Sequence, residues 1–140
     1  MSEILHRLKV FLYRHDGQRP EYLLLKPDQG IEALWGPLQS ELGFGEKLES
    51  AIRFHVRNEA GIELPGELID LDLASQWSIG DEHIVEWNFG MHCLADPNPE
   101  ALNAHWAAHR WSGFEGAYPS LGLEFDRQAI LRLHTRLEAA

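Results

Sequence analysis

Three side chains near the middle of the chain have the types and the spacing of a metal-binding group. His55, Asn58 and Glu59 stand at positions i, i+3 and i+4, and residues at that spacing share one face of an α-helix. Their nitrogen and oxygen atoms could converge on one divalent cation, which would activate water and neutralise charge on a phosphoanhydride. We therefore take Glu59, His55 and Asn58 as candidate metal ligands, and Glu59 also as a candidate catalytic residue.

The segment that carries these residues is predicted to be one amphipathic helix from about 47 to 60. Gly45 and Glu46 precede it, and Gly61 follows its last turn, where a glycine commonly ends a helix. Apolar residues recur along it at the spacing of a single helical stripe, at Leu48, Ala51, Ile52, Val56 and Ala60. The stripe should pack on a core, with the three ligand candidates beside it.

The ligand candidates carry little negative charge for a hard cation. Only Glu59 is a carboxylate, and each carboxylate missing from such a group removes on the order of several kcal/mol of gross attraction to a divalent ion. A set with an imidazole suits Mn²⁺, Zn²⁺ or a softer ion better than Mg²⁺. Structural alternatives stay open, with His55 as a hydrogen-bonded residue at the edge of the stripe and Asn58 as a surface residue.

The spacing along this segment resembles the Nudix box of nucleoside-diphosphate-X hydrolases. That pattern is Gly, five residues, Glu, seven residues, then Arg-Glu-apolar-x-Glu-Glu-x-Gly-apolar. Laid on the chain without a gap, it matches at Glu46, Val56, Glu59 and Gly61–Ile62. The opening glycine, the arginine and two glutamates are replaced by Ser40, Phe54, His55 and Asn58. The resemblance therefore implies a degenerate box that keeps one ligand carboxylate.

Both flanks resemble the asymmetrical diadenosine tetraphosphate hydrolases of that superfamily. Residues 20–26 and Trp35 look like the strand and loop before the box, and residues 105–117 are similar to a Glu-His-x-x-Tyr-Arg-Trp segment and the short helix after it. The resemblance, which covers nearly the whole chain, implies an α/β fold. The expected architecture is a Nudix-type α/β/α sandwich, with a mixed sheet between the box helix and a C-terminal helix.

Four further residues are candidates for contacts with a nucleotide or with water. Lys26 follows an apolar strand and could meet a phosphate, and Trp35 could stack on a nucleobase. His105 stands where the family has a glutamate that assists the metal or the attacking water. Glu86 lies on a strand that contributes to the cavity in the family, so it is a candidate catalytic base; the alternative is a solvated strand residue.

The rest of the pattern alternates strands with few helices. The expected strands and the terminal helix cover residues 8–13, 21–25, 68–73, 76–79, 83–94 and 126–137. Turns are predicted at Asp16-Gly17, in a loop of more than two residues, and at Gly80-Asp81. We expect a single domain over residues 1–140.

Composition limits the classes of partner. The chain has 140 residues and is 44% hydrophobic, which suits one domain with a sizeable core. A net charge of -10, from 12 basic and 22 acidic residues, disfavours nucleic acid. The single cysteine excludes an intrachain disulfide. No apolar stretch nears the roughly 20 residues that span a bilayer, so we expect a cytoplasmic protein with no membrane partner.

Two classes of function follow. The first is a hydrolase of nucleoside or dinucleoside polyphosphates with a degraded metal site, weak or absent Mg²⁺-dependent turnover, and Mg²⁺ or Mn²⁺ as cofactor if active. The second is a non-catalytic module on the same fold that binds a small-molecule nucleotide or a protein and needs no cofactor. A homodimer is open in both cases. Two or more carboxylates at the three ligand positions of the box would favour the enzyme, and the chain has one, Glu59.

Overall fold

The computed structural model describes residues 3–27, 34–43, 45–63 and 65–139. Its elements in chain order are β1 (Glu3–Asp16), β2 (Arg19–Lys26), β3 (Leu38–Glu41), α1 (Leu48–Ala60), β4 (Pro65–Ile79), β5 (Glu82–Cys93), α2 (Pro99–His105), β6 (Ala108–Gly113), α3 (Phe114–Ser120) and α4 (Glu124–Ala139). Within these ranges no helix is long and apolar enough to cross a bilayer.

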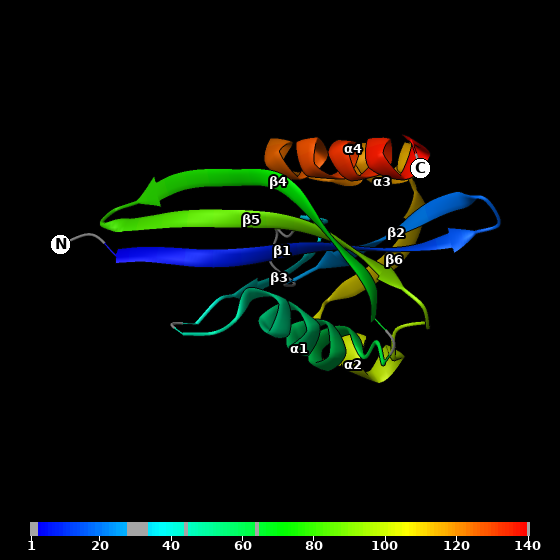
Figure 1. Cartoon of the computed structure of the whole chain (residues 1–140), viewed down its shortest axis with the longest axis horizontal. Coiled ribbons are helices and arrows are strands. Elements are labelled where there is room, and N and C mark those ends of the chain that lie inside the picture. Colours follow the sequence, from blue (N-terminus) through cyan, green and yellow to red (C-terminus); the bar gives the residue numbers. More distant parts are fainter. Residues whose placement is uncertain (1–2, 28–33, 44, 64, 140) are drawn as a thin grey trace.

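A mixed sheet forms the middle layer. It has six strands, of which five lie in the order β4-β5-β1-β2-β6, and the sixth, β3, pairs with β1 beside that path. β1 and β5 run parallel, whereas the other pairs are antiparallel. In Figure 1, α1 and α2 lie on one side of the sheet and α3 and α4 on the other. This arrangement confirms the predicted α/β/α sandwich with the sheet between the box helix and the C-terminal helix.

Alternation along β1 divides the core between the two faces of the sheet. Leu8, Val10 and Leu12 belong to the cluster that includes the buried stripe of α1, whereas Phe11 and Tyr13 belong to the cluster beneath α4. Successive residues of a strand point to opposite faces, so one central strand supplies both cores.

The box helix has the predicted position and cap. Gly61 ends α1 in the left-handed region at φ 66°, and its N–H donates to the Arg57 carbonyl. A side chain at this position would overlap the Asn98 side chain, so both the backbone conformation and the packing favour glycine.

The strands differ from the prediction in several respects. β3 and β6 were not among the expected strands. Asp16 pairs directly with Arg19, so the first hairpin has a two-residue loop and not the longer one expected. β4 is one strand and not two, with a bulge between Asp70 and Ala74. Asp72 has a φ of 51° in this bulge, and its N–H donates to the Asp70 carboxylate at 2.9 Å. That local hydrogen bond lets the strand kink without ending.

Candidate functional site

The ligand candidates on α1 form a hydrogen-bonded pair and a separate exposed residue. His55 Nδ1 lies 2.7 Å from a Glu59 carboxylate oxygen, and the two side chains are 22% and 20% exposed. Asn58 is exposed. Among the described residues, no group of three or more His, Cys, Asp or Glu side chains is placed to hold a metal ion. The structure therefore brings His55 and Glu59 together, but with their donor atoms bonded to each other.

Lys26, Trp35 and Arg110 form a second group, called here the cationic cluster. Lys26 Nζ lies 4.9 Å and Arg110 Cζ 4.8 Å from the centroid of the Trp35 ring, within the range of cation–π attraction. Arg110 also donates to Ser120 Oγ at 2.6 Å. Two positive charges thus meet on one aromatic ring in a chain with a net charge of -10.

Arg110 was missed at the sequence level, although the two other members of the cluster were predicted. β6 pairs with β2 so that Arg110 faces Leu24 and Ala108 faces Lys26. Directly opposed residues share a face of the sheet, so Arg110 and Lys26 lie on the same side. Only this pairing, which no local pattern in the sequence marks, brings the two cations together.

Two hydrogen bonds connect the cationic cluster with the end of α1. The Trp106 indole donates to the Glu59 carbonyl at 3.3 Å, and the Ala107 N–H donates to the Lys26 carbonyl at 2.8 Å. His105, which precedes these residues at the end of α2, is exposed. Glu59, His105 and the cationic cluster therefore adjoin one end of β2, but Lys26 and Arg110 lie on the face of Leu24, which packs in the core on the α4 side, and Glu59 lies on the α1 side.

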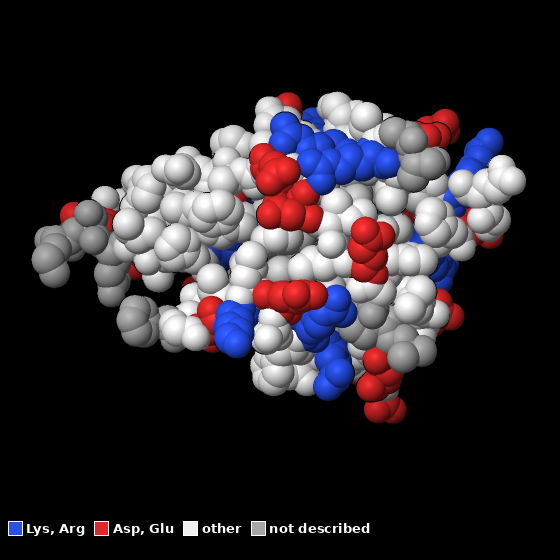
Figure 2. Space-filling view, in the orientation of Figure 1, with Lys and Arg blue, Asp and Glu red and all other residues white. Residues whose placement is uncertain are grey.

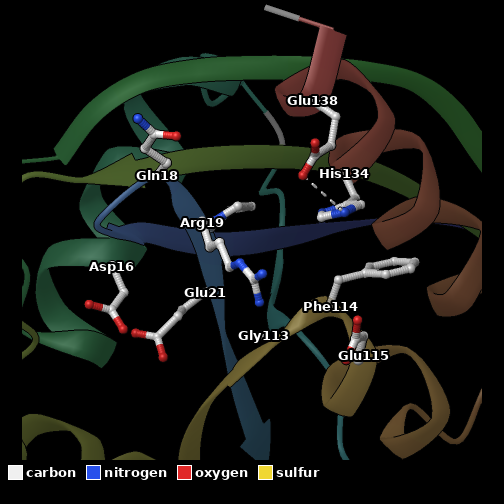
Figure 3. Close-up of a pocket in the computed structure, with 10 residues that line it drawn as sticks. Asp16, Gln18, Arg19, Glu21, Gly113, Phe114, Glu115, His134 and Glu138 are labelled. Atoms are coloured by element: carbon white, nitrogen blue, oxygen red, sulfur yellow. Dashed lines mark ion pairs between the residues drawn. The ribbon is translucent and has the colours of Figure 1, made fainter.

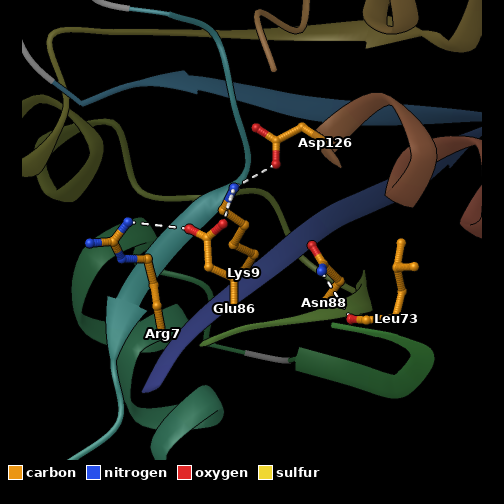
Figure 4. Close-up of polar contacts among 6 residues, drawn as sticks. All are labelled: Arg7, Lys9, Leu73, Glu86, Asn88 and Asp126. Carbon is orange, nitrogen blue, oxygen red and sulfur yellow. Dashed lines mark hydrogen bonds and ion pairs between the residues drawn. The ribbon is translucent and has the colours of Figure 1, made fainter. Parts of the chain in front are cut away.

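Glu86 is buried, so the alternative of a solvated strand residue is wrong. Its side chain is 4% exposed and pairs with Arg7 Nη1 at 3.2 Å and Lys9 Nζ at 3.4 Å. Lys9 also donates to Asp126 Oδ1 at 2.7 Å. Figure 4 shows Arg7, Lys9, Glu86 and Asp126 joined in this way, a group called here the buried ion cluster.

The sheet separates Glu86 from Glu59. Along β5, Phe89 packs in the core on the α1 side, whereas Gly90 lies against Leu133 of α4. Glu86 shares the face of Gly90 because the two are an even number of residues apart in a strand whose pairing with β1 has no register shift. A carboxylate on the α4 face, bonded to two cations, is not placed to act on water held at Glu59.

Burial dominates the electrostatics of Asp126 in the ion cluster. It raises the pKa of Asp126, and the positive charge of Lys9 opposes that rise without cancelling it. Asn88 lies on the same face, donates its amide to the Leu73 carbonyl at 3.0 Å, and has a buried Oδ1 with no partner among the described groups. Such an arrangement stabilises one packing of α4 on the sheet only as long as every charge stays paired.

A cavity of about 600 Å³ opens elsewhere, between the first hairpin, α3 and α4. The Phe114 and His134 rings stack in it at 4.2 Å, and the Tyr22 hydroxyl is hydrogen-bonded to His134 Nδ1 at 2.7 Å. Figure 3 shows Arg19 in its middle, with acidic side chains around. None of the predicted site residues lines this cavity, and no motif in the sequence marks it.

Comparison with known proteins identifies the fold. No family model and no curated protein matches the chain. Among solved structures, the dihydroneopterin triphosphate pyrophosphohydrolase of E. coli has a TM-score of 0.75 at 18% identity and covers 94% of this chain and 95% of its own. An Ap4A hydrolase binary complex from C. elegans has a TM-score of 0.72 at 17% identity, and the match covers 97% of this chain and 99% of the hydrolase. The Nudix domain of Shewanella oneidensis NrtR, complexed with ADP ribose, has a TM-score of 0.72 at 14% identity, and the match covers 100% of this chain and 91% of the NrtR domain. The chain has the Nudix fold.

Within this Nudix fold, α1 is the box helix, and its donor set does not fit Mg²⁺. One carboxylate, one imidazole and one exposed amide replace the several oxygens that a hard cation prefers. The only carboxylate of the set, on Glu59, is also bonded to His55. Such a set fits a borderline ion such as Mn²⁺ or Zn²⁺ better, after the bond between His55 and Glu59 has been broken.

At two other positions of the Nudix box, Glu46 and Phe54, the side chains make local contacts beside α1 and do not reach the candidate metal ligands. A Glu46 carboxylate oxygen accepts a hydrogen bond from the Gly43 N–H at 2.6 Å, which holds the turn that leads into α1. Phe54 is 60% exposed and meets the His55 ring edge-on at 5.4 Å. Neither side chain contributes charge to the face that carries Glu59.

Proposed function

We propose that the chain binds nucleoside or dinucleoside polyphosphates as a Nudix-superfamily pyrophosphohydrolase whose Mg²⁺-dependent turnover is weak. The observation that carries this proposal is the cationic cluster, which lies at the end of β2 on the face of the sheet covered by α3 and α4. Lys26 and Arg110 both lie within cation–π distance of Trp35, and a polyphosphate can accept hydrogen bonds from both cations. The chain as a whole, with a net charge of -10, would repel such an anion elsewhere on its surface.

The proposed roles follow from the chemistry of each side chain. Lys26 and Arg110 neutralise phosphate oxygens. When these two cations move from the Trp35 ring to the phosphate, the ring is free to stack on a nucleobase. Glu59 is the ligand for a divalent ion, with His55 and Asn58 as its auxiliaries, and His105 contacts the substrate from the end of α2. When bound, the metal would polarise a phosphoryl oxygen or a water molecule. Glu86 holds the buried ion cluster together instead of acting as a base.

A second function is favoured by the bond between His55 and Glu59. A carboxylate already satisfied by an imidazole has less to gain from binding a cation, and without a metal the fold would bind a nucleotide and not cleave it. The Nudix domain of NrtR was solved with ADP ribose, which illustrates a nucleotide-derived ligand on this fold. On this alternative the cationic cluster keeps its role and the α1 face has none.

The first test measures product release from a panel of nucleoside and dinucleoside polyphosphates with Mg²⁺, Mn²⁺ or a chelator. Turnover by the wild type that is stronger with Mn²⁺ than with Mg²⁺, and that is lost in Glu59→Gln, would support the hydrolase. Turnover equal in the wild type and Glu59→Gln would refute a catalytic role for Glu59. The absence of turnover above the chelator control would support the binding module.

The second test measures binding directly, by calorimetry with a non-hydrolysable polyphosphate analogue. Lys26→Gln and Arg110→Gln should each weaken binding by roughly 10- to 100-fold, since a charge-assisted hydrogen bond contributes about 1.5–3 kcal/mol. Arg19→Gln is the matched control, because Arg19 is an exposed arginine at the far end of β2. Equal affinities in all three variants would refute the cationic cluster as the phosphate site.

A further inference from the structure

The guanidinium group of Arg110 is held by a neutral partner. Arg110 Nη2 donates to Ser120 Oγ at 2.6 Å, and Ser120 Oγ donates its own proton to the Gly116 carbonyl at 2.7 Å. A serine hydroxyl has one proton and two lone pairs, so the proton given to Gly116 leaves the oxygen as an acceptor for Arg110. Ser120 therefore fixes the direction of the guanidinium group without neutralising it.

The arginines of α4 are engaged in a different way. Figure 2 shows basic side chains gathered over α4 next to acidic ones over β4. Arg136 lies 3.5 Å from the Asp72 carboxylate, and Arg132 donates to two carbonyls of β4. No salt bridge among the described residues includes Arg110 or Lys26. The charge of the cationic cluster is thus available to an anion.

The segment that carries Ser120 also holds Trp35. Residues 120–122, called here the α3–α4 connector, are the last residue of α3 and the two that follow it. Leu121 is 2% exposed and forms a parallel bridge with Trp35, and the Gly122 N–H donates to the Trp35 carbonyl at 3.5 Å. A side chain at Gly122 would overlap the residue before Trp35. The α3–α4 connector therefore places two of the three members of the cationic cluster.

Without Ser120, Arg110 would be a mobile side chain. It is exposed and projects from β6, an outer strand of the sheet, where an arginine has many rotamers. The Trp35 ring keeps the guanidinium group near by cation–π attraction, whereas the hydrogen bond to Ser120 also sets which of its N–H groups stay free. A guanidinium group ordered in advance loses less side-chain entropy when an anion binds.

We propose that Ser120 is a positioning residue of the cationic cluster, which holds the Arg110 guanidinium group so that its free N–H groups donate to one phosphate of the ligand. This inference rests on the proposed function, because it takes the cationic cluster as the phosphate site. It goes beyond that function by assigning part of the affinity to a side chain that acts only through Arg110. The paired N–H groups of an arginine match the oxygens of a phosphate, so their direction matters as well as their charge.

The order of Arg110 can be measured by NMR without a ligand. The Nη1 and Nη2 groups of an arginine give separate signals when rotation of the guanidinium group is slow, and one averaged signal when it is fast. Arg110 should give separate signals in the wild type and in Ser120→Thr, which keeps the hydroxyl, and an averaged signal in Ser120→Ala. Ser112→Ala is the matched control, because the Ser112 hydroxyl donates to the Gly113 carbonyl, and it should match the wild type. Identical Arg110 signals in the wild type and Ser120→Ala would overturn the proposal.

Ser120→Asp separates position from charge. A carboxylate at this place would hold Arg110 by a charge-assisted hydrogen bond and also cancel its charge. The Nη1 and Nη2 signals of Arg110 should therefore stay separate, while the affinity for a non-hydrolysable polyphosphate analogue should fall below that of Ser120→Ala. Wild-type affinity in Ser120→Asp would contradict the need for a neutral partner.

Calorimetry with the same analogue measures the consequence for binding. Ser120→Ala should weaken binding by about 2- to 10-fold, the range expected for one side chain that must be ordered, and Ser120→Thr and Ser112→Ala should bind as the wild type does. In the Arg110→Gln background, Ser120→Ala should have no further effect, because the hydroxyl acts through the guanidinium group. An equal loss in both backgrounds, or no loss in either, would overturn the role of Ser120. Arg110→Gln with wild-type affinity would instead refute the phosphate site on which the proposed function rests.

Discussion

Removal of Lys9 should cost this protein a large part of its stability. Lys9 is 1% exposed, and its ammonium group lies 2.7 Å from Asp126 and 3.4 Å from Glu86. Lys9→Met fills a similar volume but leaves the Asp126 carboxylate without a cation. Of the buried ion cluster, only the pair of Arg7 and Glu86 then remains. Removal of one partner of a buried pair costs about 3–5 kcal/mol, which is a large fraction of the total of about 5–15 kcal/mol for a typical domain.

The cost can be measured by urea unfolding followed by tryptophan fluorescence. With a slope of about 2 kcal/mol per molar urea, a loss of about 4 kcal/mol lowers the midpoint by about 2 M. Lys47→Met is the control, because Lys47 is exposed and surface substitutions change stability by about 0.5 kcal/mol or less. A loss below about 1 kcal/mol for Lys9→Met would refute the reasoning.

The double variant Lys9→Met/Asp126→Leu separates charge pairing from packing. Burial raises the pKa of Asp126 even with Lys9 beside it, so the ionised pair does not recover the full cost of its desolvation. Replacement of both charges with apolar groups should therefore restore most of the stability, since such replacements are often neutral or stabilising. Glu86 keeps Arg7 as its partner. A double variant as unstable as the single one would show that the packing around Lys9, not its charge, is what matters.

Three further outcomes are expected. Because the pKa of Asp126 is raised above its ordinary 3.8, the folded state retains this proton at a higher pH than the unfolded state does, and the stability from this group is present at low pH and lost as the pH rises through the folded pKa. The free energy of unfolding of the wild type relative to Asp126→Asn, measured in urea from pH 3.5 to 7, should therefore fall with pH. A difference that does not change with pH would contradict this. Gly61→Ala should lose about 2–4 kcal/mol, from strain at φ 66° and overlap with Asn98, whereas Gly17→Ala, at φ 65° in open space, should lose only about 1 kcal/mol; equal losses in thermal melts would argue against the overlap. Burial raises the pKa of the Cys93 thiol to about 12, so a thiol reagent at pH 8 should label it only after denaturation, and rapid labelling of the native protein would show that the site is open.

Local patterns predicted the parts of this structure that local physics determines. The apolar spacing of α1 and the glycine after it were enough to place the helix and its cap, because both depend on residues within a few turns. β4 was predicted as two strands, 68–73 and 76–79, whereas the structure continues it through the bulge that contains Asp72, at φ 51°. The hydrogen bond from the Asp72 N–H to the Asp70 carboxylate lets the strand kink without ending, which a pattern of hydropathy does not reveal.

Contacts between distant segments account for what the sequence did not predict. Glu86 looked like a solvated residue because its neighbours alternate, yet the parallel pairing of β5 with β1 places Arg7 directly beside it. Arg110 joins Lys26 and Trp35 only through the pairing of β6 with β2. In both cases the partner is supplied by the sheet order, which the resemblance suggested in outline but without the charges that this chain places there.

The altered positions of the box lie outside the core of the protein. Phe54 and Asn58 are exposed and His55 is only partly buried, whereas the apolar stripe of the same helix is buried except for Leu48 in its first turn. Folding therefore constrains the stripe and leaves the ligand positions almost free. Substitutions can accumulate on that face by neutral drift, and new carboxylates could be introduced there by mutation, without the helix leaving its place.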